Sequence, residues 1–208
     1  MASAELISRE PATGEAVWSG IAGDVDAEVA TARTAWPDWA ARPLTVRVET
    51  LRRFANVVRA RQDGLADLIA WETGKPLWEA RTEVESVVNK VDISVGAYAE
   101  RTPQRRLEGN MGARVAVRHK PHGVLGVLGP YNFPAHLPNG HIVPALIAGN
   151  AVVFKPSEHT PAVGLALVEC FHEAGVPPEV LRCVPGGAEE GRALAGHPDL
   201  DGLLFTGS

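Results

Sequence analysis

The chain has 208 residues, enough for one well-buried domain, and its hydrophobic (45%) and charged (22%) shares are ordinary for a globular protein. Its net charge of −5, with no basic stripe, gives no sign of nucleic-acid or anionic-membrane binding. The 2 cysteines are too few for a disulfide framework and favour a reducing, cytoplasmic location. We expect no signal peptide, because the amino terminus has neither a basic start nor an apolar core, and no membrane-spanning segment, because no apolar run is long enough to cross a bilayer.

Helical patterns dominate the first hundred residues. Residues 1–23 indicate loop and short strand, with a turn at residues 11–14. Apolar residues at helical spacing then predict helices over residues 24–41, 45–61 and 64–73, and a long fourth helix with Pro76 at its first position. Pro37 falls inside the first helix and is expected to kink or interrupt it.

The pattern changes at residue 103. A cluster of turn residues at 108–112 separates two polar arms, and residues 114–118 alternate as a half-exposed strand does. A β-hairpin projecting from the main body is therefore expected between residues 103 and 122.

From residue 123 onward, strands and helices alternate. Apolar runs predict strands near residues 123–128, 151–154, 180–184 and 202–205, and helices lie between them near 138–148, 160–174 and 187–196. Thr160 is expected to cap the second of these helices, with Pro161 at its first position. Such alternation predicts an α/β fold with a parallel sheet flanked by helices.

Two of these strands end in polar residues that are able to support chemistry. Asn132 follows the first strand, and Lys155 and Glu158 follow the second. Ligands of parallel α/β sheets bind at the carboxyl ends of the strands, so these side chains are expected to meet in one crevice. An amide donor such as Asn132 is able to stabilise an oxyanion. Taken alone, however, the spacing also fits an Asn that satisfies a turn and an ordinary solvated Lys–Glu pair.

Other reactive residue types give weaker indications. Cys170 and Cys183 lie in apolar contexts typical of buried structural thiols. The spacing of the histidines predicts no metal site. Gly186 lies after a strand, where a glycine either permits close approach of a phosphate or simply serves the turn, and we weigh both equally.

The segments at the strand ends also carry a resemblance to a known family. Residues 129–134 (GPYNFP) and 149–158 (GNAVVFKPSE), together with 72–76 (ETGKP) and 205–208 (FTGS), resemble the aldehyde dehydrogenase superfamily over essentially the whole chain. Residues 121–146 resemble one branch in particular, whose members oxidise a succinylated semialdehyde in bacterial arginine catabolism. Members of the superfamily are more than twice as long, so the resemblance implies a chain truncated before the catalytic domain and inactive alone.

The resemblance implies roles for individual residues. Asn132 would be the catalytic oxyanion donor, and Lys155 and Glu158 would contact the adenosine ribose of NAD. Glu158 would repel the 2′-phosphate of NADP and so favour NAD. Further cofactor contacts are implied for Pro130, Tyr131, Ser157, Gly186, Gly207 and Ser208. Phe133, His136, Leu137 and Gly140 would line the substrate passage, where the absence of a side chain at Gly140 leaves room for a long polar substrate.

The same resemblance suggests how the chain is divided. Residues 1–102 would be the helical part of a Rossmann-type dinucleotide-binding domain, 103–122 a hairpin of the oligomerisation type, and 123–208 the parallel βα part, which is incomplete. The expected partners are a small aldehyde and other copies of the chain, with no nucleic acid and no membrane. Two alternatives stay open: an aldehyde dehydrogenase of another substrate class, and a truncated module without catalysis.

Overall fold

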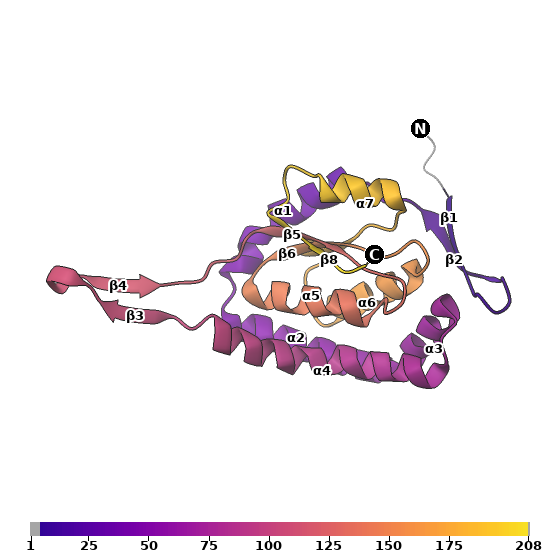
Figure 1. Cartoon of the computed structure of the whole chain (residues 1–208), viewed down its shortest axis with the longest axis horizontal. Coiled ribbons are helices and arrows are strands. Elements are labelled where there is room, and N and C mark those ends of the chain that lie inside the picture. Colours follow the sequence, from indigo (N-terminus) through magenta and orange to yellow (C-terminus); the bar gives the residue numbers. More distant parts are fainter. Residues whose placement is uncertain (1–4, 208) are drawn as a thin grey trace.

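One parallel sheet organises the chain, and a computed structural model describes residues 5–207 (Figure 1). The strand order is β7-β6-β5-β8, where β5 is Val124–Leu128, β6 is Ala151–Lys155, β7 is Leu181–Cys183 and β8 is Gly202–Phe205. Val127 lies opposite Phe154 on one side and Leu204 on the other, and all the strands of this sheet pair in parallel. The expected parallel α/β sheet is confirmed.

Helices cover both faces of this sheet in layers (Figure 1). The strands β5 and β6 are almost entirely apolar because both of their faces are buried. One face packs against α1 (Val25–Ala41) and α7 (Ala188–Ala195), and the other against α5 (His136–Ala148) and α6 (Pro161–Glu173). Outside α5 and α6 lie α2 (Leu44–Ala60), α3 (Gln62–Thr73) and α4 (Leu77–Arg101). Among residues 5–207, no helix combines the length and apolarity needed to cross a bilayer.

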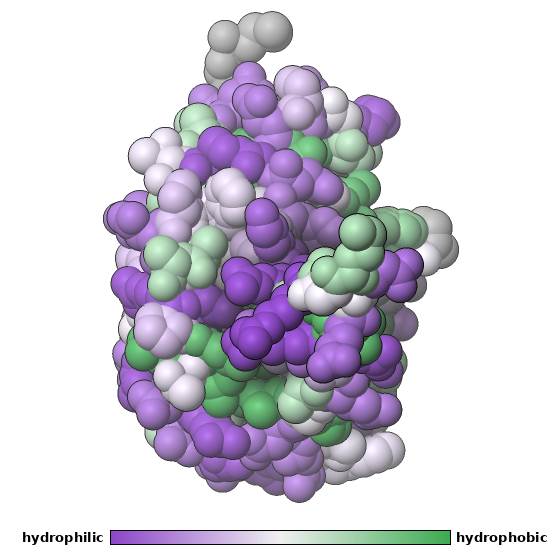
Figure 2. Space-filling view, turned by 90° about the vertical axis from the view of Figure 1, so that its left-hand side faces the viewer, coloured by the Kyte–Doolittle hydropathy of each residue, from purple (hydrophilic) through white to green (hydrophobic). Residues whose placement is uncertain are grey.

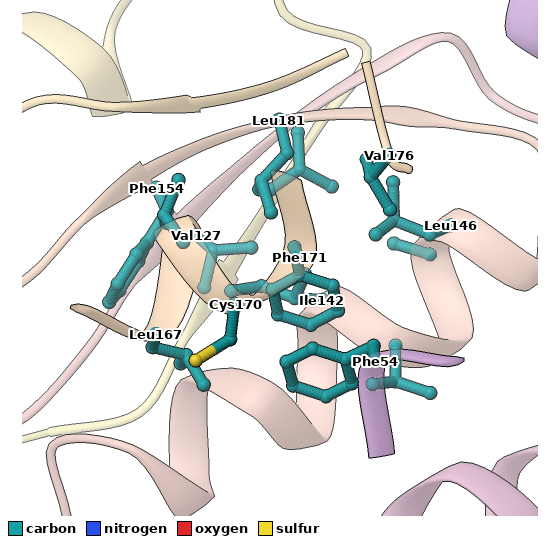
Figure 3. Packing of buried hydrophobic residues seen from close by; sticks show 14 of the residues in the cluster. Phe54, Val127, Ile142, Leu146, Phe154, Leu167, Cys170, Phe171, Val176 and Leu181 are labelled. Atoms are coloured by element: carbon teal, nitrogen blue, oxygen red, sulfur yellow. The ribbon is translucent and has the colours of Figure 1, made fainter. Parts of the chain in front are cut away.

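The hydrophobic core joins the outer helices to the sheet (Figure 3). The rings of Phe54 from α2 and Phe171 from α6 stack in parallel with their centroids 3.6 Å apart. Leu167 of α6 and Phe154 of β6 are fully or almost fully buried in the same cluster. The helix α6 therefore mediates between the sheet and the outer helical layer.

Pro37 does not interrupt α1, which was one of the two outcomes expected for it. The helix runs unbroken from Val25 to Ala41, capped by the Asp24 side chain on the N–H of Ala27. Trp36 and Trp39 donate their ring N–H groups, each at 3.1 Å, to carbonyl oxygens at the end of α5. These tertiary contacts hold the helix in place, although proline removes one hydrogen bond within it.

The first segment is more ordered than its sequence indicates. Residues Glu5–Arg9 (β1) and Ala16–Ile21 (β2) form an antiparallel hairpin around the expected turn. Pro76 is the N-cap of α4 rather than its first helical residue. The second difference is a shift of one residue at a helix end, where sequence patterns are least informative.

A second hairpin projects from the body, as expected (Figure 1). Its strands are β3 (Arg105–Glu108) and β4 (Arg114–Val117), joined by the short helix η1 (Asn110–Gly112). Every residue of the two strands is exposed, including Leu107 and Val115. Figure 2 views the molecule from the side on which the hairpin projects and shows hydrophobic and hydrophilic residues side by side on that face. A two-stranded hairpin of this kind is only marginally stable by itself in water.

Candidate active site

The loops that follow β5, β6 and β8 meet at one end of the sheet. The N–H of Gly129 donates to the carbonyl of Lys155 at 3.1 Å, and the N–H of Thr206 donates to that of Leu128 at 3.3 Å. The ring of Tyr131 also meets that of His159 edge-on, with centroids 5.8 Å apart. These contacts join three strand ends, where parallel sheets bind their ligands.

A cavity of about 520 Å³ opens between these strand ends, and Asn132 lines it. The Asn132 side chain is exposed, so its amide is available to a ligand in the cavity. The other lining residues are Gly129, Pro130, Tyr131, Leu137, Ser157, Phe205, Thr206 and Gly207. The structure thus brings together one expected catalytic residue and several expected cofactor and substrate residues. Ser208, another expected cofactor contact, lies outside the described residues.

Lys155 and Glu158 do not line this cavity; they form a second region, connected to it along the chain by Ser157, which does line it. The Lys155 ammonium is almost fully buried and donates to the carbonyl of Pro156 at 3.0 Å. It lies 3.7 Å from the carboxylate of Glu158, which is about half exposed (45%). Burial lowers the pKa of Lys155, and the negative charges of Glu158 and Glu190 oppose that shift.

The amino end of α7 closes this second region. Gly186 precedes it, and a Cβ atom there would lie 2.4 Å from the Cγ of Glu190, so only glycine fits. The Glu190 carboxylate accepts the N–H of Gly187 at 2.7 Å. Gly191 faces the Lys155 side chain, where a Cβ would be in ordinary contact at 3.7 Å. Glycine is therefore required at Gly186 by local packing, and this requirement does not depend on a ligand.

The expected substrate residues lie on or before the first turn and a half of α5. Leu137 lines the cavity, whereas Phe133 is partly buried and is not among the lining residues. The Nδ1 atom of His136 is buried and has no hydrogen-bond partner among residues 5–207. A Cβ atom at Gly140 would be in ordinary contact with the end of the Lys90 side chain, at 3.7 Å, and neither Gly140 nor His136 lines the cavity. His141 instead contacts the Thr206 hydroxyl at 2.8 Å.

Both histidines of α5 are biased toward the neutral form. Burial lowers the pKa of His136 and of His141, and the nearby ammonium of Lys90 lowers both further. Glu83 partly opposes the shift at His136. Within residues 5–207, no three His, Cys, Asp or Glu side chains form a group able to hold a metal ion.

A larger cavity, of about 650 Å³, lies elsewhere, between α2, α3 and α4. Its lining includes the charged side chains of Arg59, Arg81 and Glu85. It is remote from the strand ends and holds none of the expected site residues. The smaller cavity is therefore the candidate active site, because it combines an available amide with the position at which parallel sheets bind ligands.

The two thiols are placed as structural groups. Burial raises the pKa of Cys170 to about 11 and that of Cys183 to about 12. Since the thiolate is the nucleophilic form, neither cysteine is equipped to attack an aldehyde at neutral pH.

This gives a direct prediction of reactivity. In the native chain, iodoacetamide at neutral pH should leave Cys170 and Cys183 unmodified during the time in which free glutathione reacts completely. Mass spectrometry of the intact protein measures the labelling. The same chain unfolded in urea is the control and should take up two labels. Rapid labelling of either thiol in the native protein would contradict its assignment as a buried, unreactive group.

The sequence did not predict the two side chains that bind the main chain of the Asn132 loop. Lys75 donates to the carbonyl of Asn132 at 2.7 Å and to the carboxylate of Glu83 at 2.8 Å. Glu83 accepts the N–H groups of Ala135 and His136 at 2.9 and 3.1 Å. Lys75 belongs to the ETGKP segment, which contributed to the resemblance without suggesting any such contact.

The fold and the site together define a parallel α/β domain with a ligand cleft at the carboxyl ends of its strands. The family model described as "Aldehyde dehydrogenase family" matches residues 2–208, and the chain belongs to this family.

Individual relatives agree with this assignment. The chain is 75% identical over 206 residues to a protein of Sphingopyxis alaskensis named N-succinylglutamate 5-semialdehyde dehydrogenase, and covers 99% of itself and 43% of that relative. It superposes on an NADP-dependent glyceraldehyde-3-phosphate dehydrogenase of Bacillus halodurans, solved with NADP, with a TM-score of 0.93 and 30% identity. This match covers 99% of the present chain and 45% of that enzyme's chain. It also superposes on an NAD-dependent benzaldehyde dehydrogenase of Corynebacterium glutamicum with a TM-score of 0.91 and 29% identity. This match covers 99% of the present chain and 46% of the benzaldehyde dehydrogenase. The chain thus spans less than half the length of these relatives.

Proposed function

We propose that this chain is the cofactor-binding portion of an NAD-dependent enzyme that oxidises N-succinyl-L-glutamate 5-semialdehyde to N-succinyl-L-glutamate in arginine catabolism. The observation that carries the proposal is the available Asn132 amide in the cavity at the strand ends, beside the Lys155–Glu158 pair. The name of the 75% identical relative supports the substrate. The free thiols of Cys170 and Cys183 agree with a cytoplasmic enzyme.

In this proposal, Asn132 acts on the oxygen of the aldehyde. When a nucleophile adds to the carbonyl carbon, negative charge develops on that oxygen, and the Asn132 side-chain N–H is placed to donate to it. A neutral donor stabilises this charge without introducing a competing ion into the cleft. The nucleophile and the general base are expected from the part of the enzyme outside this chain, since neither thiol here is reactive.

The residues beside the cavity fit a nicotinamide dinucleotide, which would accept the hydride lost by the aldehyde. The exposed Glu158 carboxylate is suited to accept hydrogen bonds from two ribose hydroxyls, and Lys155 to donate to one. Ser157 and Gly207 line the same cavity as Asn132. The carboxylate also carries a charge that opposes a 2′-phosphate, so we propose NAD rather than NADP as the cofactor.

Removing that charge tests the cofactor preference. In the Glu158→Gln variant, the ratio of kcat/KM for NADP to that for NAD should rise about tenfold, equivalent to about 1.4 kcal/mol, because a like-charge contact with the phosphate is lost. The assay requires a full-length enzyme, for which this chain replaces the matched 206 residues of the Sphingopyxis alaskensis relative; we call it the hybrid enzyme. Glu169→Gln, on the exposed side of α6, is the matched control and should leave the ratio unchanged. Equal use of both cofactors by the unmodified hybrid would contradict the proposal.

The substrate side favours a long, negatively charged aldehyde. No side chain fills the space at Gly140, and Lys90 places a positive charge beside it and beside both histidines. A succinylated semialdehyde carries carboxylates that this charge would attract. Comparing kcat/KM of the hybrid enzyme for the succinylated semialdehyde, a short aliphatic aldehyde and benzaldehyde tests the assignment. Preference for an unsuccinylated aldehyde would identify another substrate class, and no activity on any aldehyde would favour a module without catalysis.

We further propose that the enzyme is a homo-oligomer joined through the β3–β4 hairpin. Leu107, Met111, Val115 and Val117 are all exposed on this projection. A hairpin this short is poorly stable in water, so a second copy of the chain is the expected source of its missing contacts. Sedimentation of the hybrid enzyme with and without charged replacements at Leu107 and Val115 would show whether the hairpin joins subunits.

A further inference from the structure

A buried ion pair lies behind the loop that carries Asn132. The ammonium of Lys75 and the carboxylate of Glu83 are 2.8 Å apart, and their side chains are only 9% and 0% exposed. Lys75 lies in the corner between α3 and α4, and Glu83 lies on α4, so neither belongs to the sheet or to the loops at its strand ends. Burying a pair of charges in this way stabilises a fold little, which suggests that the pair serves another purpose.

The pair fixes the main chain on both sides of Asn132. The Lys75 ammonium donates to the carbonyl of Asn132 at 2.7 Å and lies 4.1 Å from the ring centre of Phe133. The Glu83 carboxylate accepts the N–H groups of Ala135 and His136. All the main-chain groups that bind the pair lie within residues 132–136, while the Asn132 side chain stays exposed toward the cavity.

The same corner also binds the start of α6, the helix that follows β6. Glu72, at the end of α3, accepts the N–H groups of Ala162 at 3.1 Å and Val163 at 2.8 Å, at the start of α6. The ETGKP segment therefore binds main-chain groups at the start of α6 through Glu72 and in the loop that carries Asn132 through Lys75.

We propose that Lys75 and Glu83 are positioning residues that hold the Asn132 amide in its working orientation, an inference that rests on the proposed function. An oxyanion donor is effective only when it is ordered before the reaction, and small displacements reduce the rate strongly. The charges of the pair suit this role, because the ammonium makes strong bonds to a carbonyl and a ring, and the carboxylate accepts several N–H groups at once. Because the pair is neutral overall, it adds no net charge to the cleft.

The test compares Lys75→Met, Lys75→Arg and Glu83→Gln in the hybrid enzyme. Lys75→Met should lower kcat/KM for the aldehyde about 10- to 100-fold, because the loop and its amide lose their anchor. The KM for NAD should stay within about twofold, since Lys155 and Glu158 do not contact the pair. Lys75→Arg should recover part of the loss, because arginine keeps a donor to the Asn132 carbonyl. Arg81→Met is the matched control: it removes an exposed cation from α4, the helix that carries Glu83, and should change neither kcat/KM for the aldehyde nor the KM for NAD.

A second measurement follows the loop directly in the 208-residue chain. Hydrogen exchange of the amides of Ala135 and His136 should become at least about tenfold faster in Glu83→Gln and Lys75→Met, but not in Arg81→Met. If Lys75→Met does not fold, Glu83→Gln and Lys75→Arg are compared in the same way.

The outcomes separate this inference from the proposed function. Unchanged aldehyde kinetics in an active hybrid would overturn the positioning role alone. A lower kcat/KM for the aldehyde accompanied by a comparable rise in the KM for NAD and a lower melting temperature would also overturn it. Such a combination would indicate a general structural role for the pair. A hybrid that oxidises no aldehyde even without substitutions would overturn the proposed function itself, and the catalytic positioning role with it.

Discussion

Replacing Asn132 by alanine in the hybrid enzyme is expected to lower both kcat and kcat/KM for the aldehyde by about 100- to 1000-fold. This is the usual cost of removing one donor from an oxyanion site. The side chain is exposed in the cavity at the strand ends, while the carbonyl of the same residue is held by Lys75. Because the amide stabilises charge that forms only during the reaction, both constants should fall equally.

Steady-state kinetics with saturating NAD measure this effect. Binding of NAD should be little changed, since Lys155 and Glu158 lie outside the cavity that Asn132 lines. The control is Asn89→Ala, which removes the same amide from the exposed side of α4 and should be neutral. A kcat of the Asn132 variant within about threefold of the unmodified hybrid would show that another group stabilises the oxyanion.

The parts of the fold that could be predicted from sequence are those governed by local pattern and burial. The runs at Val124–Leu128 and Ala151–Lys155 are apolar without alternation, which is typical of strands buried on both faces. Parallel order then follows from the helices between them. This reasoning also places Asn132 beside a cleft, because the carboxyl ends of parallel strands share one edge of the sheet.

The contacts that escaped prediction depend on partners distant in the sequence. Thr160 is at the N-cap of α6, as expected, yet its hydroxyl is buried and has no partner among the described residues. The capping bonds come instead from Glu72, which precedes the helix by about ninety residues. Likewise, Pro37 is tolerated in α1 because Trp36 and Trp39 bind the end of α5. No local spacing carries such information, so the support of the site could not be predicted.

The second large effect concerns this cap. Replacing Glu72 by alanine should lower the free energy of unfolding of the 208-residue chain by about 2–4 kcal/mol. The substitution leaves the N–H groups of Ala162 and Val163 without their acceptor, and also the hydroxyl of Ser8, which donates to the same carboxylate. Ser8 lies on β1, so the N-terminal hairpin should loosen together with α6. Urea unfolding followed by circular dichroism measures the change.

The pH dependence of this loss distinguishes the buried carboxylate from a surface one. Burial raises the pKa of Glu72, despite the hydrogen bonds that favour its charged form. The folded state therefore holds this proton more tightly than the unfolded state, and the stabilisation by Glu72 is greatest below its ordinary pKa and declines as pH rises. The difference between the native chain and Glu72→Ala should accordingly be larger in mildly acidic buffer than at neutral pH. The exposed Glu85→Ala on α4 is the control, expected within about 0.5 kcal/mol of the native chain. A loss for Glu72→Ala no greater than for this control would mean that α6 does not depend on a carboxylate from α3.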